Sequence, residues 1–410
     1  MGFKEFQLKD VCSYSKERIG IDNIKLSNYI STENLLPDKA GKVAASSLPK
    51  VKSVAKYRAG DTLISNIRPY FRKIWFSEEG GGASGDVLIF RPNEELVYNK
   101  YLYYFLSQNE VFDYMVQTSK GTKMPRGDKA ALMTYPIVLP SMEKQKEIAM
   151  KLSDLDKKIK FNTMTIKNLE QLAQTLFKRW FVDFEFPNEN GEPYKSNGGE
   201  MVESELGMVP NGWKSGRLTD IATLIMGQSP KSDSYNEDGM GLPLINGASD
   251  FRKDHINPLK YTTDPKRLSE KGDFIFGVRA TVGNVTYVDQ EYALGRGVGV
   301  ARVKKEEYRE ILYFQLINGI DYLKSTATGS VYINLTKNDI EGMQFVIPGL
   351  KYVNKFHENI ASFFEQKNLL ISQNKALENL RDTLLPKLLS GEIELLGETE
   401  VMDDVSIPRG

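Results

Sequence analysis

The side chains that most enzymes use for acid–base chemistry or for metal binding are scarce in this chain. Its 410 residues include one cysteine, Cys12, and two histidines, His255 and His357. A structural zinc site needs about four such ligands, and no disulfide can form within the chain. His357 lies in a stretch with a heptad pattern, where we expect a surface or seam position. His255 lies in a polar stretch that we predict to be a loop.

Sequence motifs for nucleotide chemistry are also missing. Residues 80–85 read GGGASG and match the dinucleotide fingerprint literally. That fingerprint needs a strand before it and a helix after it, whereas the strand-like run Val87–Phe90 follows here. We therefore interpret the glycines as a flexible loop. The chain has no Walker loop, and residues 66–71 (NIRPYF) are only a distant echo of the tetrad of DNA amino-methyltransferases. We also find no nuclease cluster, so the sequence predicts no catalytic centre, metal site or cofactor.

The positive signals are loops rich in cations, amides, hydroxyls and glycine. Arg and Asn can read base edges with two hydrogen bonds, Lys, Ser and Thr contact phosphate, and Gly lets the backbone approach closely. Taken singly, each residue could equally be an ordinary solvated one, so the hypothesis depends on similar loops recurring at equivalent places. The candidate DNA-binding residues are Arg68, Arg72, Lys73, Lys120, Thr122, Lys123, Arg126, Gln228, Ser229, Arg279, Thr281, Asn284, Arg296, Thr328, Ser330 and Tyr332.

The overall charge supports nucleic-acid binding only weakly. The chain has 54 basic and 54 acidic residues. Residues 1–140 carry a net charge of roughly +5, and residues 205–345 are about neutral. No run approaches the ~20 apolar residues of a membrane span, and the first ten residues have no apolar signal segment. We expect a cytoplasmic protein.

An internal repeat organises the chain. Residues 169–176 (LEQLAQTL) recur as residues 377–384 (LENLRDTL), and at the same offset Pro140 meets Pro348 and Gly121 meets Gly329. The order of the similar segments is the same throughout, which indicates a duplication. Each half begins with about 140 residues of short strand-like and helical runs. The strand-like runs include Val87–Phe90 and Val298–Arg302, and the helical runs include 101–107 and 310–318.

A long heptad-patterned helix follows each head. The first carries its seam at Ile148, Leu152, Leu155, Ile159, Asn162, Ile166, Leu169, Ala173 and Leu176. The second carries Phe356, Ile360, Phe363, Lys367, Leu370, Asn374, Leu377, Arg381 and Leu384, and it stops near Pro386 or Gly391. Such a pattern is typical of a coiled coil, in which seam residues such as Asn162 and Asn374 can fix the register. Alternatively, each helix packs only on its own head.

These patterns predict an α+β chain of two similar α/β heads joined by two long helices that form a coiled coil. The predicted parts are a first head at 1–140, a first helix at 141–185, a linker at 186–204, a second head at 205–348, a second helix at 349–391 and an acidic tail at 392–410.

The layout resembles the specificity subunits of type I restriction–modification enzymes (HsdS family) over essentially the whole chain. Residues 138–149 (VLPSMEKQKEIA) resemble the family's iPLPPLxEQxxIA segment, and residues 176–181 (LFKRWF), 207–213 (GMVPNGW) and 227–230 (GQSP) are typical of it. The second copy departs from the pattern, because residues 350–355 (LKYVNK) lack the Glu-Gln pair.

The resemblance implies two target-recognition domains, each reading half of a split asymmetric site on double-stranded DNA. It implies an antiparallel helix pair that acts as a ruler, two modification (methyltransferase) subunits, and restriction/translocase subunits beyond them. S-adenosylmethionine, ATP and magnesium would bind those partners and not this chain. The alternatives are a coiled-coil scaffold with protein-binding heads and an enzyme with an unrecognised site. A steep fall of DNA affinity with rising salt concentration would favour the specificity subunit over the scaffold. Catalytic turnover by the chain alone would favour an enzyme with an unrecognised site.

Overall fold

The computed structural model describes residues 3–247, 250–252, 255–279, 282–326 and 334–393. The chain divides into two compact units. Unit 1 consists of Met1–Lys160 and Lys375–Gly410, and unit 2 consists of Phe161–Asn374. Among the described residues, no helix is long and apolar enough to cross a membrane.

The head of unit 1 is built on an antiparallel four-stranded sheet in the order β2-β9-β6-β7. A second sheet has the order β3-β5-β8-β4, and β1 pairs with β10. The strands are β1 (Lys4–Gln7), β2 (Cys12–Tyr14), β3 (Arg18–Gly20), β4 (Tyr29–Ile30), β5 (Ser53–Tyr57), β6 (Thr62–Ser65), β7 (Ile74–Phe76), β8 (Gly81–Ala83), β9 (Val87–Pro92) and β10 (Pro136–Leu139). The helices are α1 (Leu8–Val11), α2 (Asn99–Leu106), α3 (Asn109–Gln117) and α4 (Lys129–Met133).

The head of unit 2 repeats this plan, with a central sheet in the order β14-β23-β20-β21 and a second in the order β15-β19-β16-β22. The strands are β11 (Met201–Ser204), β12 (Gly207–Pro210), β13 (Lys214–Arg217), β14 (Ala222–Met226), β15 (Tyr235–Asn236), β16 (Leu242–Ile245), β17 (Phe251–Arg252), β18 (His255–Ile256), β19 (Lys260–Thr262), β20 (Phe274–Gly277), β21 (Val285–Tyr287), β22 (Ala293–Leu294), β23 (Val298–Val303) and β24 (Gln344–Ile347). The helices are α6 (Leu218–Ile221), α7 (Arg309–Thr326) and α8 (Lys337–Glu341).

A buried ion pair recurs in both central sheets. In unit 1, Arg91 on β9 donates to both carboxylate oxygens of Asp61 at 3.0 and 2.7 Å. In unit 2, Arg302 on β23 donates to Asp273 at 2.8 and 2.9 Å. Each aspartate precedes the neighbouring strand and is only 2% exposed. The same topology with the same internal pair confirms the predicted duplication.

The two heads differ in the second sheet. In unit 1 the early strand β4 lies at the edge, parallel to β8, and β5 pairs with β8. In unit 2 the early strand β16 lies inside, where it pairs with both β19 and β22. The central sheets therefore form a shared scaffold, while the second sheets have diverged.

Two local interpretations of the sequence were wrong, and His357 makes a contact that its sequence position did not predict. Residues 81–83 of the glycine-rich stretch form the buried strand β8 rather than a flexible loop, and a Cβ on Gly81 would lie only 2.2 Å from the Asn28 carbonyl oxygen. His255 begins the short strand β18, which pairs with β17. His357 is partly exposed on α9, within the predicted surface or seam position, and its Nδ1 lies 2.7 Å from a carboxylate oxygen of Glu310 on α7. In each case a pairing partner distant in sequence decides the structure.

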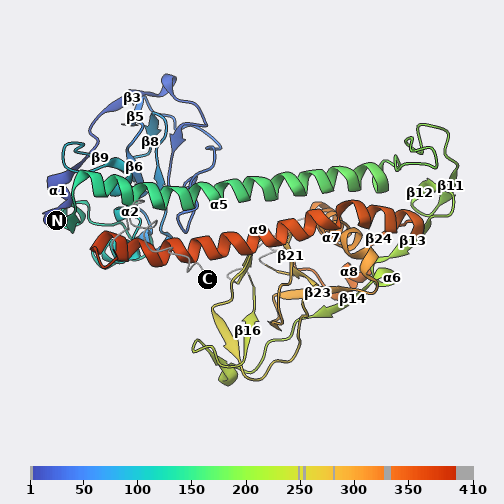
Figure 1. Cartoon of the computed structure of the whole chain (residues 1–410). Helices are drawn as coiled ribbons and strands as arrows, with labels where there is room; N and C mark the ends of the chain where they lie inside the picture. The colour runs from blue at the N-terminus through green and yellow to red at the C-terminus, as the bar shows by residue number, and fades with distance from the viewer. Residues whose placement is uncertain (1–2, 248–249, 253–254, 280–281, 327–333, 394–410) are drawn as a thin grey trace, which may run out of the picture. The chain divides into compact units, whose positions relative to one another are not determined.

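The two long helices are α5 (Met142–Phe177), which a short π-helical turn (Lys178–Val182) extends, and α9 (Leu350–Ser390). Figure 1 draws α5 in green and α9 in red. α5 contains neither glycine nor proline, and α9 contains only Pro386 near its end. Such sequences keep the backbone hydrogen bonds of a long helix intact. Gly391, with φ of 77°, adopts the left-handed conformation that ends α9.

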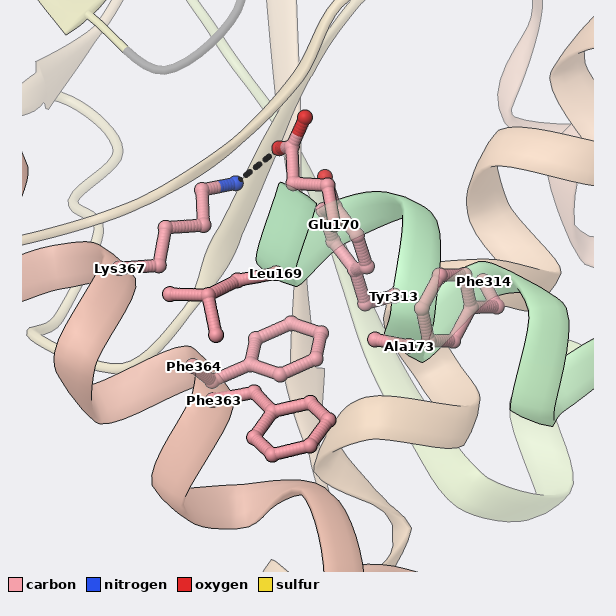
Figure 2. A pocket seen from close by; sticks show the side chains of 8 residues that line it. All are labelled: Leu169, Glu170, Ala173, Tyr313, Phe314, Phe363, Phe364 and Lys367. Atoms are coloured by element: carbon pink, nitrogen blue, oxygen red, sulfur yellow. Dashed lines mark hydrogen bonds and ion pairs between the residues drawn. The ribbon is translucent and has the colours of Figure 1, made fainter. Parts of the chain in front are cut away.

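In unit 2, polar side chains link α5 and α9 along their seam. Asn162 donates to Gln373 at 2.8 Å and to Asn374 at 2.9 Å. Further along α5, Glu170 accepts a hydrogen bond of 2.5 Å from Lys367 of α9 (Figure 2). Residue numbers rise along α5 while those of their partners fall along α9, so the helices pair antiparallel.

The same antiparallel order holds in unit 1. Arg381 on α9 donates to Asp156 on α5 at 2.9 Å. Leu152 near the start of α5 belongs to the same buried cluster as Leu385 and Leu388 near the end of α9. The heptad prediction of a paired helix is therefore confirmed, and the alternative, in which each helix packs only on its own head, is wrong.

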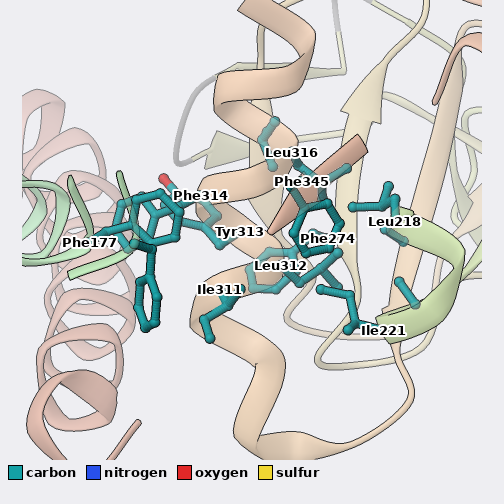
Figure 3. Close-up of a cluster of buried hydrophobic side chains, with 14 of the residues drawn as sticks. Phe177, Leu218, Ile221, Phe274, Ile311, Leu312, Tyr313, Phe314, Leu316 and Phe345 are labelled. Carbon is teal, nitrogen blue, oxygen red and sulfur yellow. The ribbon is translucent and has the colours of Figure 1, made fainter. Parts of the chain in front are cut away.

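An apolar core holds the head of unit 2 onto the helices (Figure 3). The α7 side chains Leu312 and Leu316 pack toward Phe274 of β20, while Phe314 meets Phe177 of α5 with ring centroids 4.8 Å apart. The segment 186–204, predicted as a linker, contributes to this core through fully buried Phe186, whose ring stacks on Trp213 at 4.8 Å. Phe186 is an apolar residue in a polar, turn-rich segment, so the sequence pattern did not predict its contact with Trp213.

We predict that Asp61→Asn destabilises the central sheet of unit 1. The substitution removes the buried partner of Arg91, which costs roughly 3 kcal/mol for a pair of this kind. Amide hydrogen exchange in β6 and β9 should report that fall in opening free energy, while β20 and β23 serve as an internal reference. Asp273→Asn is the matched control and should affect β20 and β23 instead. Unchanged protection of β6 and β9 in Asp61→Asn would contradict the prediction.

Candidate nucleic-acid interface

The loop between β6 and β7 and the loop between α3 and α4 meet at one end of the central sheet of unit 1. The Arg68 amide donates to the Pro125 carbonyl at 2.8 Å, and the Gly127 amide donates to the Asn66 carbonyl at 3.1 Å. Ile67 and Lys120 each form a β-bridge with Arg126. Two groups of predicted DNA-binding residues that lie about 50 positions apart in the sequence are therefore brought together.

Acidic side chains hold most of the cations in this region. Lys120 donates to Asp128 at 2.6 Å, Arg126 lies 3.2 Å from Asp86, and Arg72 lies 3.7 Å from Asp113. The hydrogen bond from Lys120, together with the amides of Ala131 and Ala130, lowers the pKa of Asp128.

These ion pairs lie at the surface, where they contribute little to stability. The side chain of Lys120, for example, is 82% exposed. A phosphate could therefore replace the carboxylates at small cost.

The remaining predicted residues of this head differ in exposure. Thr122 and Lys123 are exposed, and Lys123 has no ion-pair partner in the described part of the chain. Lys73 instead turns inward and donates to the Thr32 carbonyl at 2.6 Å, and burial lowers its pKa. Its contact ties two loops of the head together.

Two buried polar atoms at the same place lack a partner among the described residues, namely Asn66 Oδ1 and Arg68 Nε. An unsatisfied buried polar group costs about 1–3 kcal/mol. Arg68 also has φ of 50°, which L-residues seldom adopt. Residues kept in such conformations cluster at functional sites, which supports this loop as the site.

Unit 2 brings a different set of residues to the corresponding end of its sheet. The Val278 amide donates to the Gly297 carbonyl at 3.0 Å, as the Asn66 amide does to the Asp86 carbonyl at 2.8 Å in unit 1. The Leu335 amide donates to the Val278 carbonyl at 2.8 Å, in the position of the Gly127–Asn66 bond. The loops therefore leave equivalent ends of equivalent strands.

Gln228, Ser229 and Arg296 gather at this end of unit 2. The Gln228 amide donates to the Leu294 carbonyl at 2.9 Å, and Arg296 Nε donates to Ser229 Oγ at 3.2 Å. The close packing requires glycine, because a Cβ on Gly227 would lie 2.1 Å from the Gly295 carbonyl oxygen. Arg296 itself remains exposed.

Arg279 and Asn284 belong to the β20–β21 loop, in which Arg279 is exposed and the Asn284 carbonyl accepts from the Gly277 amide at 3.3 Å. Thr281, Thr328, Ser330 and Tyr332 lie outside the described residues.

Sequence reasoning missed the acidic partners Asp86, Asp113 and Asp128, and also Asn246 beside Ser229, whose side-chain oxygens are 3.5 Å apart. No local pattern marks them, because each meets its partner through tertiary contacts. Among the described residues, no group of three or more His, Cys, Asp or Glu side chains could hold a metal ion.

Comparison with known proteins identifies the family. Residues 1–171 and 210–379 match the model of the type I restriction modification DNA specificity domain. The chain belongs to this family. The two matched segments correspond to the two copies of the repeat.

Matches to individual relatives cover most of both chains. The putative type I restriction enzyme MjaX specificity subunit of Methanocaldococcus jannaschii is 27% identical over 362 residues, covering 84% of this chain and 82% of that protein. The HindI specificity subunit of Haemophilus influenzae is 25% identical over 456 residues, covering 95% and 99%. The crystal structure of the type I restriction-modification S subunit from M. genitalium has the same fold, with a TM-score of 0.57, 14% identity and coverage of 95% and 96%.

We predict that neutralising Lys120, Lys123 and Arg126 together weakens DNA binding and flattens its salt dependence. Each lost phosphate contact lowers the slope of log K against log salt by roughly one, so the slope should fall by up to about three. Binding titrations at several salt concentrations would measure it. Lys157, Lys158 and Lys160, exposed on α5, provide a control triple whose neutralisation should leave the slope unchanged. Equal slopes for wild type and the loop variant would show that this loop does not contact DNA phosphates.

Proposed function

We propose that this chain is the DNA-specificity subunit of a type I restriction–modification complex. It reads a bipartite, asymmetric site on double-stranded DNA and recruits methyltransferase and restriction subunits. The observation that carries the proposal is the pair of heads in which equivalent sheet ends bear different polar loops. Two such readers on one chain can recognise two different short sequences, and their linkage raises affinity through effective concentration.

In this proposal the chain itself is not catalytic. Two modification subunits bind it and supply the site for S-adenosylmethionine, and restriction subunits supply the sites for ATP and magnesium. The names of its relatives as specificity subunits support this division of labour. A scaffold with protein-binding heads would instead bind DNA weakly and without dependence on its sequence.

We predict that the two heads act independently. Replacing residues 1–140 with the matching head of a relative should change one half of the methylated motif and leave the other half unchanged. Sequencing the methylome of cells that carry the chimera, together with its methyltransferase subunit, would show this directly. The reciprocal exchange of residues 205–348 is the control and should change only the other half. A change in both halves after either exchange would contradict independent reading.

We further predict that the helix pair sets the spacing of the half-sites. Four residues inserted into α5 after Ile166 and four into α9 between Lys367 and Asn374 lengthen both helices by about 6 Å and rotate them by roughly 40°. Both insertions lie between the seam contacts Asn162–Asn374 and Glu170–Lys367, so the flanking contacts are retained. One added base pair advances DNA by about 3.4 Å and rotates it by a similar angle.

The methylated motif should therefore gain a spacer longer by one to two base pairs, with both half-sites unchanged. A chain with the insertion in α5 alone is the control, and it should lose methylation because the two seams no longer match. If the double-insertion chain is active and methylates a motif with the original spacer, the helix pair does not set the distance between the half-sites.

A further inference from the structure

Tyr70 and Phe71 form an exposed aromatic pair within the candidate interface of unit 1. Their side chains are 50% and 38% exposed, and their ring centroids lie 4.7 Å apart. Met124, on the neighbouring α3–α4 loop, is 51% exposed and precedes Pro125, which accepts the backbone bond from Arg68. Clustered apolar side chains on a surface with a polar rim mark binding sites. This apolar tip has no role in the contacts with phosphates described above.

The backbone holds this pair in an unusual and well-supported conformation. Arg68 and Arg72, which flank residues 69–71, are both left-handed, with φ of 50° and 49°. The facing residues Asp38 and Lys39 are also left-handed, and their amides donate to the carbonyls of Phe71 at 2.9 Å and Arg72 at 3.0 Å. Four of the five non-glycine residues with positive φ in the described chain thus lie at this one junction. Such conformations persist only where the surroundings fix them, and they concentrate at functional sites.

The charge around the pair favours duplex DNA as its partner. Arg68 and Arg72 flank it directly, and Lys123 and Arg126 are exposed on the adjoining loop. Cations of this kind bind phosphates. Binding of the DNA backbone there would place Tyr70 and Phe71 next to the bases. Arg72 and Arg126 pair with the surface carboxylates of Asp113 and Asp86, which a phosphate can replace at small cost.

We propose that Tyr70, supported by Phe71, inserts at a base step of the first half-site and makes this head a reader of DNA deformability. The inference rests on the proposed function of the chain. Apolar side chains inserted between base pairs unstack and kink the duplex, and pyrimidine–purine steps deform most easily. Head 1 therefore selects a flexible step that it does not read by hydrogen bonds. The corresponding loop of head 2, residues 279–284 (RATVGN), contains no aromatic residue, so this loop has no counterpart of Tyr70.

The test uses the chain in complex with its methyltransferase subunit and duplexes that carry the methylated motif. 2-Aminopurine replaces in turn each adenine of both half-sites except the bases that become methylated, because DNA methyltransferases flip their own target base out of the stack. Wild type should raise its fluorescence at one step of the first half-site only. Tyr70→Ala should abolish this rise and weaken binding by about 5- to 100-fold, the usual effect of losing one aromatic–base stack. Its salt slope should remain that of wild type, because no phosphate contact is lost.

Tyr70→Phe is the matched control, since it keeps the ring and removes only the hydroxyl, and it should behave as wild type. A thermal melt of each variant checks that the head remains folded. The proposal is overturned if Tyr70→Ala binds like wild type, if no position responds in the wild-type complex, or if Tyr70→Phe loses as much affinity as Tyr70→Ala. The proposed function stands in each of these cases as long as wild type still binds its motif more tightly than scrambled DNA. Failure of wild type to distinguish the motif from scrambled DNA would instead refute the proposed function.

Discussion

Polar side chains pair along the seam between α5 and α9, where Asn162 and Lys367 are buried, and they constrain how the two helices can pair. Asn162 must meet Asn374, Glu170 must meet Lys367, and within unit 1 Asp156 must meet Arg381. Apolar seams tolerate sliding, because one leucine packs much like another. A shift by one turn would leave the buried Asn162 amide and Lys367 ammonium without partners, at a cost of several kcal/mol. The polar pairs therefore fix the register that the apolar residues alone would leave open.

The heads attach to this helix pair by contacts that differ between the units. In unit 1, the Tyr104 hydroxyl donates to Asp156 at 2.6 Å, so the residue that pairs with α9 also anchors the head. In unit 2, Phe314 packs with both Phe177 of α5 and Phe364 of α9, and Lys367 lies over the ring of Tyr313 at 5.3 Å. Each head thus shares residues with the seam, which explains why the register matters for the position of the reading loops.

A net charge of zero is compatible with DNA binding because the cations of the candidate interface are held by nearby acids. Lys120 and Arg126 are oriented by Asp128 and Asp86 at the protein surface. These carboxylates offset the charge in the free protein and pre-position the side chains. The net charge of the whole chain therefore does not indicate the cluster of cations at the interface, which is apparent only where the loops meet at the end of the sheet.

The sequence by itself determined the features that follow from local periodicity and from repetition. Apolar residues three and four apart specified α5 and α9, and the offset of 208 between Pro140 and Pro348 specified two similar heads. Tertiary structure decided what depends on contacts distant in sequence. Gly81–Ala83 became a buried strand because Tyr57 and Asn28 close around glycine, which has no side chain of its own to signal burial. The loops around Arg68 and Arg126 became one surface because strand pairing placed them at the same sheet end. Hydrogen bonds between strands and loops depend on the order in which strands assemble, and no local pattern of residues encodes that order.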